Sequence, residues 1–315
     1  MASLIIRRLA SALPVLLLVS LISFVLIWLV PGDAAAELAG PSASPEELAH
    51  IRTDLGLDQP VWIQALHWYR NLLHGDLGQS LLLGRSVAAA ILERLPVTLS
   101  LTGFALVITL LFGIGSGTIA ALKRNSWIDQ AVMMTALVGL SLPDFWLGLV
   151  AIYVFSVALG WFPTGGFVAF GDSPVGWLQT TTLPAIALAL TQTGLLARMT
   201  RSSLLEVLSQ DYIRTAWAKG LPGRIVILKH ALLNIAVPVL TVLGISIGIL
   251  FSGAVVIESV FAIPGVGRLI IDAVLRRDLP VIQGGILIIG VFMVTVNIAV
   301  DLLYAAFDPR VRHEH

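Results

Sequence analysis

Long apolar runs separated by short polar segments dominate this chain. Five runs without a charged residue are long enough to cross a bilayer: residues 9–30, 97–122, 173–197, 235–257 and 281–300. A sixth run, residues 130–160, is interrupted only by Asp144. A spanning helix needs about 20 apolar residues, because each residue rises about 1.5 Å through a core about 30 Å thick. The pattern therefore predicts an all-α integral membrane protein with six transmembrane helices.

The charges between these runs predict the orientation. If both termini are cytoplasmic, 12 of the 19 Lys and Arg residues lie on that side, and four of the other seven lie in one long external loop. Positive residues concentrate in cytoplasmic segments, and long loops contribute little to this bias. We therefore expect N-in and C-in. The first run has 22 apolar residues, against about 7–15 in a signal peptide, so we expect it to be retained.

This layout divides the chain into four parts. They are an N-terminal transmembrane helix (1–30), an external, periplasmic loop with amphipathic helices (31–96), a core of five transmembrane helices (97–305) and a cytoplasmic tail (306–315). Within the core, residues 198–234 are expected to form a basic cytoplasmic loop.

Composition agrees with a membrane protein and excludes several kinds of site. The 315 residues are 57% hydrophobic and 12% charged, about half the ~25% charged share of soluble domains. Equal numbers of basic and acidic residues, 19 of each, favour neither nucleic acid nor an acidic substrate. The absence of cysteine excludes disulfides and thiolate metal sites. None of the lysines, at 123, 219 and 229, precedes Ser or Thr, so ATP hydrolysis by a Walker A loop must take place on another protein.

Two helices are predicted in the external loop. Residues 44–47, Ser-Pro-Glu-Glu, form a capping box, and this helix is expected to end at Gly56. A second helix begins near Pro60 and ends at Gly75. The residues that helical spacing places on one of its faces are Trp62, Leu66, Tyr69 and Leu73.

These amphipathic helices have three interpretations. They can lie along the membrane surface or form a platform for an external partner. His67 and His74 share a face, so a metal site is a third reading, but two imidazoles lack the further ligands that metal sites in proteins use. We therefore expect no metal site in this chain.

A short helix with a defined start and end is predicted in the cytoplasmic loop. Asp211 is a suitable N-cap, residues 212–219 form the helix, Gly220 supplies a left-handed residue after it, and Pro222 prevents continuation. A helix of about two turns is not stable alone in water, so it must pack against another surface.

Docking to a cytoplasmic partner would supply that surface. Arg214 and Lys219 are expected at the rim of an apolar groove on the partner. The residues expected to face into the groove are Ile213, Ala216, Trp217 and Gly220. The alternative is a positively charged loop that rests on anionic lipid.

Six strings give the chain a family resemblance. They are DYIRTAWAKGLPGRIVILKHALLNIAVPVLT (211–241), GDLGQS (75–80), RLPVTLSL (94–101), GLSLPDFWLGL (139–149), ESVFAIPGVGRL (258–269) and NIAVDLLYAAFDPRVR (297–312). In their order along the chain they resemble the permease subunits of bacterial binding-protein-dependent ABC importers, in particular the dipeptide, oligopeptide and nickel branch. The first string resembles the EAA loop of that family. Where the wider superfamily has Glu-Ala-Ala, this chain has Arg214-Thr215-Ala216, so no role of that glutamate is carried over.

The resemblance implies a type I importer permease in the bacterial inner membrane. Such a permease forms half of a translocation path for di- or oligopeptides, and alternating access is driven by separate ATPases; nickel chelates, glutathione or opines are alternative substrates. The residues implied to couple to an ATPase are Asp211, Tyr212, Ile213, Arg214, Ala216, Trp217, Lys219, Gly220 and Leu221.

The resemblance also implies a set of partners. They are a homologous second permease, two ATPase subunits that hold ATP and Mg²⁺, a periplasmic or lipid-anchored substrate-binding protein, and membrane lipid. It implies no cofactor in this chain and no nucleic acid.

Polar residues near the membrane are candidates for the translocation path. Asp144 follows Pro143 within a span, where a carboxylate is costly, and Phe145 and Trp146 could line a cavity beside it. Alternatively, Asp144 caps a broken helix or pairs within a permease dimer. Glu258 precedes a Pro-Gly turn that suggests an external gate, although a plain surface turn fits as well.

Other polar and small residues in the spans are expected to be structural. Asp301 can pair with Arg310 or Arg312 near the cytoplasmic end. The glycines expected to allow close helix packing are Gly113, Gly115, Gly117, Gly244 and Gly248.

Three rival functions are less well supported by the residues. An ATP-independent secondary transporter would need charged groups organised for ion coupling, and only Asp144 qualifies. An intramembrane enzyme would need paired catalytic groups within the spans, and no HExxH sequence occurs. A passive scaffold would not need the short cytoplasmic helix.

Overall fold

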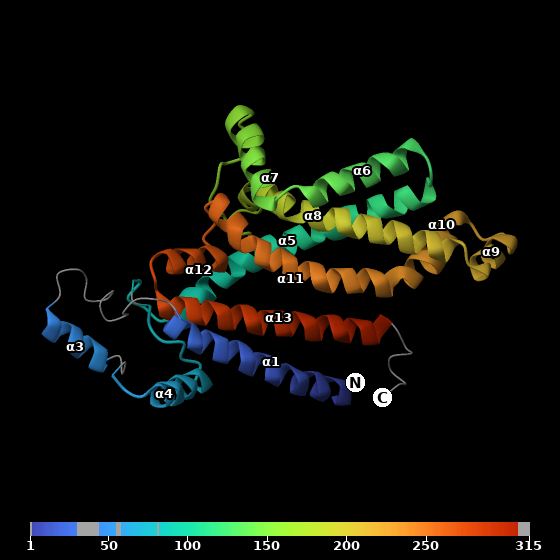
Figure 1. The fold of residues 1–315 in the computed structure, drawn as a ribbon. Helices are drawn as coiled ribbons and strands as arrows, with labels where there is room; N and C mark the ends of the chain where they lie inside the picture. Colours follow the sequence, from blue (N-terminus) through green and yellow to red (C-terminus); the bar gives the residue numbers. More distant parts are fainter. Residues whose placement is uncertain (1, 30–43, 55–57, 81, 308–315) are drawn as a thin grey trace. The chain divides into compact units, whose positions relative to one another are not determined.

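The structure is a computed structural model that describes residues 2–29, 44–54, 58–80 and 82–307 (Figure 1). Those ranges consist of helices and their connections, with one β-bridge between Gln79 and Ser86. The α-helices are α1 (Ala2–Leu29), α3 (Pro45–Asp54), α4 (Val61–Leu73), α5 (Val87–Leu122), α6 (Trp127–Ser141), α7 (Asp144–Ala151), α8 (Pro174–Leu208), α9 (Asp211–Ala218), α10 (Gly223–Ile225), α11 (Ala236–Val260), α12 (Val266–Leu275) and α13 (Leu279–Phe307). Turns of π-helix follow α7 (Ile152–Ala158) and α10 (Val226–Ala231), and a 3-10 turn (Leu232–Ile235) leads into α11.

Among the described residues, five helices or helical stretches are long and apolar enough to cross a membrane, and a sixth span results if α6 and α7 are counted together. The chain bends by 102° between these two helices. Pro143 explains the bend, because a proline disfavours helical backbone at the preceding residue, and Leu142 has φ −98° and ψ 133°. The predicted third span is therefore a broken one.

Two helices are longer than the apolar runs that predicted them. α5 begins at Val87, within the predicted external loop. α8 continues to Leu208, so residues 198–208, at the start of the predicted cytoplasmic loop, are helical. No helix-breaking residue occurs there, and the buried side chain of Leu204 holds the last turns of α8 against the core. Only Ser209 and Gln210 separate α8 from α9.

The structure divides into two compact units, and each is described by itself. The first contains residues 1–96 and 268–294. Within it, α1 and α13 exchange two hydrogen bonds: the Ser23 hydroxyl donates to the Gln283 carbonyl (3.1 Å), and the Gln283 amide donates to the Ser23 carbonyl (3.0 Å). The Ser80 hydroxyl donates to the buried carboxylate of Asp278 at 2.5 Å.

Both predicted helices of the external loop are present. The capping box is confirmed: the Ser44 N–H donates to the Glu47 carboxylate (2.9 Å), and the Glu47 N–H donates to the Ser44 hydroxyl (3.2 Å). The predicted end at Gly56 lies outside the described residues. α4 packs on α1 through Trp68, whose ring centre is 5.7 Å from that of Phe24.

The apolar face predicted for α4 is mostly turned outward. Trp62, Leu66 and Leu73 are exposed, whereas the Tyr69 hydroxyl lies 3.3 Å from the Ser20 hydroxyl of α1. The aromatic residue that lies between Leu66 and Tyr69, Trp68, makes the ring contact instead.

The second unit contains residues 97–267 and 295–315, and α8 lies at its centre. Figure 1 shows α5, α6, α8 and α11 side by side, with α7 turned away from α6. Glycines allow close approach, as predicted: Gly113 of α5 contacts Leu196, Gly117 of α5 contacts Ala197, and Gly244 of α11 contacts Val300. Gly115 faces open space instead.

Gly117 and Gly115 provide a test of this packing. A Cβ at Gly117 would lie 2.8 Å from the Cβ of Thr200 and closer still to the Ala197 carbonyl, whereas a Cβ at Gly115 has no neighbour within 4 Å. Because overpacking costs about 1–3 kcal/mol, Gly117→Val should lower the melting temperature of the purified protein, and Gly115→Val on the same helix should lower it much less. Fluorescence-detected size-exclusion chromatography after heating measures both, and equal melting temperatures would contradict the packing.

Candidate functional site

The helix α9 has a fixed C-terminal end. Gly220 adopts a left-handed conformation with φ +75°, and its N–H donates to the Trp217 carbonyl (2.9 Å). The Leu221 N–H donates to the Ala216 carbonyl (3.4 Å), which completes a Schellman motif. This confirms that the helix ends where the sequence predicts, with glycine in the left-handed position.

The start of α9 differs from the prediction by one residue. The N-cap is Gln210, in extended backbone, and it makes no side-chain capping bond. Asp211 is the first helical residue, where its charge still favours the positive end of the helix dipole. Its carboxylate lies 3.4 Å from the guanidinium of Arg214, and both side chains are exposed.

The inner face of α9 packs on its own chain. Ile213 is 1% exposed and Ala216 is 7% exposed, and both lie in an apolar cluster with Leu204 of α8 and Val226. The prediction that these two side chains face a partner's groove is therefore corrected: they attach α9 to the end of α8 and to the turns that follow it. A helix this short needs such packing to be stable.

The outer face of α9 is exposed. Tyr212 is 45% exposed and Trp217 49% exposed, and one side of the Trp217 ring lies against Gly223. The other exposed residues of this short segment are Asp211, Arg214, Thr215, Ala218, Lys219 and Gly220. Aromatic and basic side chains on an anchored helix are the composition found at protein–protein contacts.

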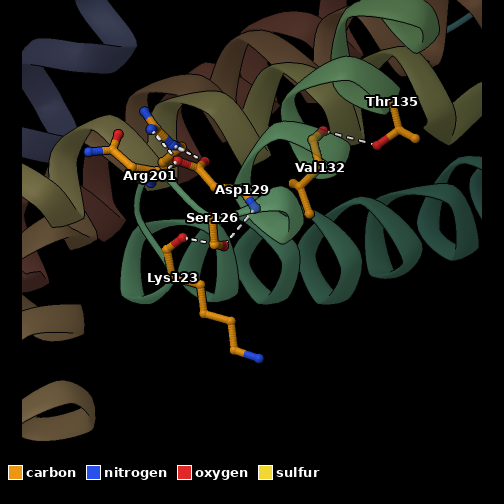
Figure 2. A network of polar contacts seen from close by, with 7 residues as sticks. Lys123, Ser126, Asp129, Val132, Thr135 and Arg201 are labelled. Carbon is orange, nitrogen blue, oxygen red and sulfur yellow. Dashed lines mark hydrogen bonds and ion pairs between the residues drawn. The ribbon is translucent and has the colours of Figure 1, made fainter.

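An ion pair not predicted from the sequence joins α6 to α8. The guanidinium of Arg201 donates to both carboxylate oxygens of Asp129, at 2.5 and 2.7 Å (Figure 2). In the sequence Arg201 is one of the basic residues of the predicted loop 198–234, and Asp129 lies just before the apolar run 130–160. The signal that could have found the pair is a single acidic residue in the first turn of a membrane helix, since such a charge needs a partner.

The break between α6 and α7 is bridged by Asp144. The Thr191 hydroxyl of α8 donates to the Asp144 carboxylate at 2.6 Å and lies 3.2 Å from the Gly139 carbonyl of α6. Asp144 is partly buried at the first residue of α7, and the neighbouring Phe145 and Trp146 are 47% and 46% exposed. Of the predicted path residues, these three lie together at the bend.

Glu258 does not lie with them. It is fully buried near the end of α11, where the Thr98 hydroxyl donates to its carboxylate at 2.5 Å. The Val266 N–H donates to the same hydroxyl at 2.9 Å, and Gly265 and Gly267 pack directly on the carboxylate. Within this chain Glu258 holds the turn at residues 261–265 in place, so its assignment to an open path is corrected.

The other polar candidates contribute no site among the described residues. His67 and His74 are exposed, and the His74 ring lies 2.8 Å from the Arg70 carbonyl. In the described ranges no group of three acidic or histidine side chains could hold a metal ion. The expected partners of Asp301 lie outside the described residues.

Comparison with known proteins identifies the family. The family model for the inner membrane component of binding-protein-dependent transport systems matches residues 113–313, and the model for the N-terminal part of such components matches residues 1–102. The fold is similar to a chain of the methionine ABC transporter MetNI in inward-facing conformations, with a TM-score of 0.59, 16% identity, and coverage of 69% of this chain and 96% of that one.

Curated relatives match over the full length. A putative peptide transport system permease of Brucella abortus is 52% identical over 314 residues, 100% of both chains. The glutathione transport system permease of Escherichia coli K12 is 43% identical over 314 residues, 100% of both chains. The dipeptide transport system permease of Alkalihalophilus pseudofirmus is 41% identical over 327 residues, 98% of each chain. Together with its apolar spans and its anchored α9, these matches show that the chain belongs to the inner membrane components of binding-protein-dependent transport systems, the multi-pass permease subunits of ABC importers.

Proposed function

We propose that this permease forms half of a translocation path for di- or oligopeptides in the bacterial inner membrane, and that separate ATPase subunits drive it through α9. The observation that carries the proposed coupling to the ATPases is that α9 is buried on one face and exposed on the other. Ile213 and Ala216 pack on the chain itself, and Tyr212 and Trp217 are exposed. Relatives with peptide, dipeptide and glutathione transport in their names support a peptide-like substrate.

The proposed assembly has a second, homologous permease, two ATPase subunits and an external substrate-binding protein, periplasmic or lipid-anchored. ATP and Mg²⁺ would bind the ATPase subunits and this chain would hold no cofactor, in line with the absence of a Walker A loop from its sequence. The chain's own role in this scheme is mechanical rather than catalytic.

In the proposed cycle, closure of the ATPases on ATP displaces α9. Because Ile213 and Ala216 are buried with Leu204 of α8, α9 cannot move without the end of α8. α8 in turn holds Asp144 through Thr191, so the movement reaches the bend where Phe145 and Trp146 are exposed. We assign the path-lining role to this bend.

The outer face of α9 can be tested by removing its aromatic rings. Tyr212→Ala with Trp217→Ala should reduce the ATPase that co-purifies with the tagged importer by about tenfold or more, because buried aromatic anchors carry much of the affinity of such contacts. Trp127→Ala is the control, since Trp127 is 77% exposed at the start of α6 and lies outside α9. Undiminished co-purification of the double variant would refute the assignment.

The charge of Asp144 gives a second test. Asp144→Asn keeps an oxygen that can accept the Thr191 hydrogen bond but removes the charge, so uptake of a labelled peptide should fall about tenfold if that charge meets the substrate's ammonium group. Membrane insertion should be unchanged. Thr191→Val separates the two effects, because it keeps the charge and removes the hydrogen bond through which α8 holds the bend. If Asp144→Asn transports at the unaltered rate, the residue is structural.

A further inference from the structure

We propose that the Asp129–Arg201 ion pair is a clamp that makes α6 follow α8 during transport, so that Asp129 and Arg201 are positioning residues for the transport cycle. This inference rests on the proposed function, because it assumes that α9 receives the movement of an ATPase. It adds a second connection between α9 and the bend at residues 142–143, which runs through α6, to the one that Thr191 makes with Asp144.

The pair has the geometry of a rigid connection. Nε of Arg201 lies 2.5 Å from Oδ1 of Asp129, and Nη2 lies 2.7 Å from Oδ2. Two parallel hydrogen bonds fix the orientation of both groups as well as their distance. The Asp129 side chain is 5% exposed and that of Arg201 is 25% exposed, so the pair is largely shielded from water.

Asp129 is itself held by the turn before α6. The Asn125 N–H donates to its Oδ2 at 3.0 Å, and the Ser126 hydroxyl, the N-cap of α6, accepts from the Asp129 N–H at 3.4 Å. Figure 2 shows Ser126 and Asp129 converging at this turn, with Arg201 reaching them from α8. A force on Arg201 therefore acts on the start of α6 and on the turn from α5.

The position of the pair along α8 matters. Arg201 lies seven residues before Leu208, the end of α8, and so stands between α9 and the other contacts of α8 with α6. On the N-terminal side of Arg201, farther from α9, Gly194 packs on the backbone of Ala136, and Thr191 contacts Gly139 and Asp144. Among these described contacts the ion pair lies nearest to α9 and is the one in which both groups are charged.

Charge explains why this contact resists separation. Two helices in van der Waals contact can slide with little penalty, but parting a buried ion pair leaves two charges without compensation in a poorly solvated site. α6 therefore moves with α8 rather than away from it. A buried pair is weak support for stability, since apolar replacements often serve as well, and fixing one arrangement is its better-attested use.

The test measures how much peptide is transported per ATP hydrolysed, in liposomes that contain the whole importer. Asp129→Asn and Arg201→Gln each remove one charge, Arg201→Lys keeps the charge without the two-point geometry, and Asp129→Arg with Arg201→Asp exchanges the partners. The matched control is the Arg85–Glu93 pair of the first unit, which has a similar distance of 2.6 Å but side chains that are 41% and 65% exposed.

We expect the two single neutralising variants to hydrolyse ATP but to transport at least about fivefold less peptide per ATP, the lower end of usual coupling strengths. The amount of peptide transported per ATP should be intermediate in Arg201→Lys, between the neutralising variants and the unaltered chain. The exchanged pair should recover part of this ratio, and Arg85→Gln should leave it unchanged. Melting temperatures, measured in parallel, separate loss of coupling from loss of fold.

Two results would overturn the inference. One is an unchanged transport-to-ATP ratio in both neutralising variants. The other is a loss of transport and hydrolysis in proportion to a lowered melting temperature, with no recovery by the exchanged pair, which would make the pair structural. If the unaltered complex itself shows no ATP-driven uptake, the proposed function fails, and this failure is visible before any variant is compared.

Discussion

A polar side chain on a helix enclosed by other helices in a membrane is most stable when a neighbouring helix supplies its hydrogen-bond partner, because neither water nor lipid can supply one. α8 is the most buried of the five unbroken candidate spans among the described residues: 61% of its most apolar stretch is buried, against 11–33% for the other four. Three of its polar side chains bond to different neighbouring helices. Arg201 bonds to α6, Thr191 to α6 and α7, and Gln192 accepts a hydrogen bond from Ser246 of α11 at 2.9 Å. The second unit is organised around these bonds.

Local features were predictable from the sequence because their causes are local. The apolar runs had to match the thickness of a bilayer, the capping box at Ser44 needs only four residues, and Gly220 ends α9 whatever the rest of the chain does. Pro143 indicates an irregular helix in the third span, but a proline within a span does not by itself distinguish a mild kink from the 102° bend that occurs.

Pairings across the fold could not be predicted in the same way. Asp129 and Arg201 are 72 positions apart, and Thr98 and Glu258 are 160 apart, so nothing in their spacing links them. The face of α9 was misassigned for a related reason. Ile213 and Ala216 are apolar, and an apolar face does not reveal whether its partner is another protein or the same chain.

The continuity of α8 has a mechanical consequence. From Thr191 to Leu208 the helix runs without a break for 18 residues, and the 17 rises between them of about 1.5 Å each span about 26 Å. If Thr191 is taken as the pivot, this length is a lever arm, and a tilt of about 10° would displace its end by about 4–5 Å, close to the rise of one helical turn. Such a rod converts a small change of angle at the bend into a displacement of α9 comparable in size to a side chain. A displacement of that size imposed on α9 is converted into the same change of angle at the bend.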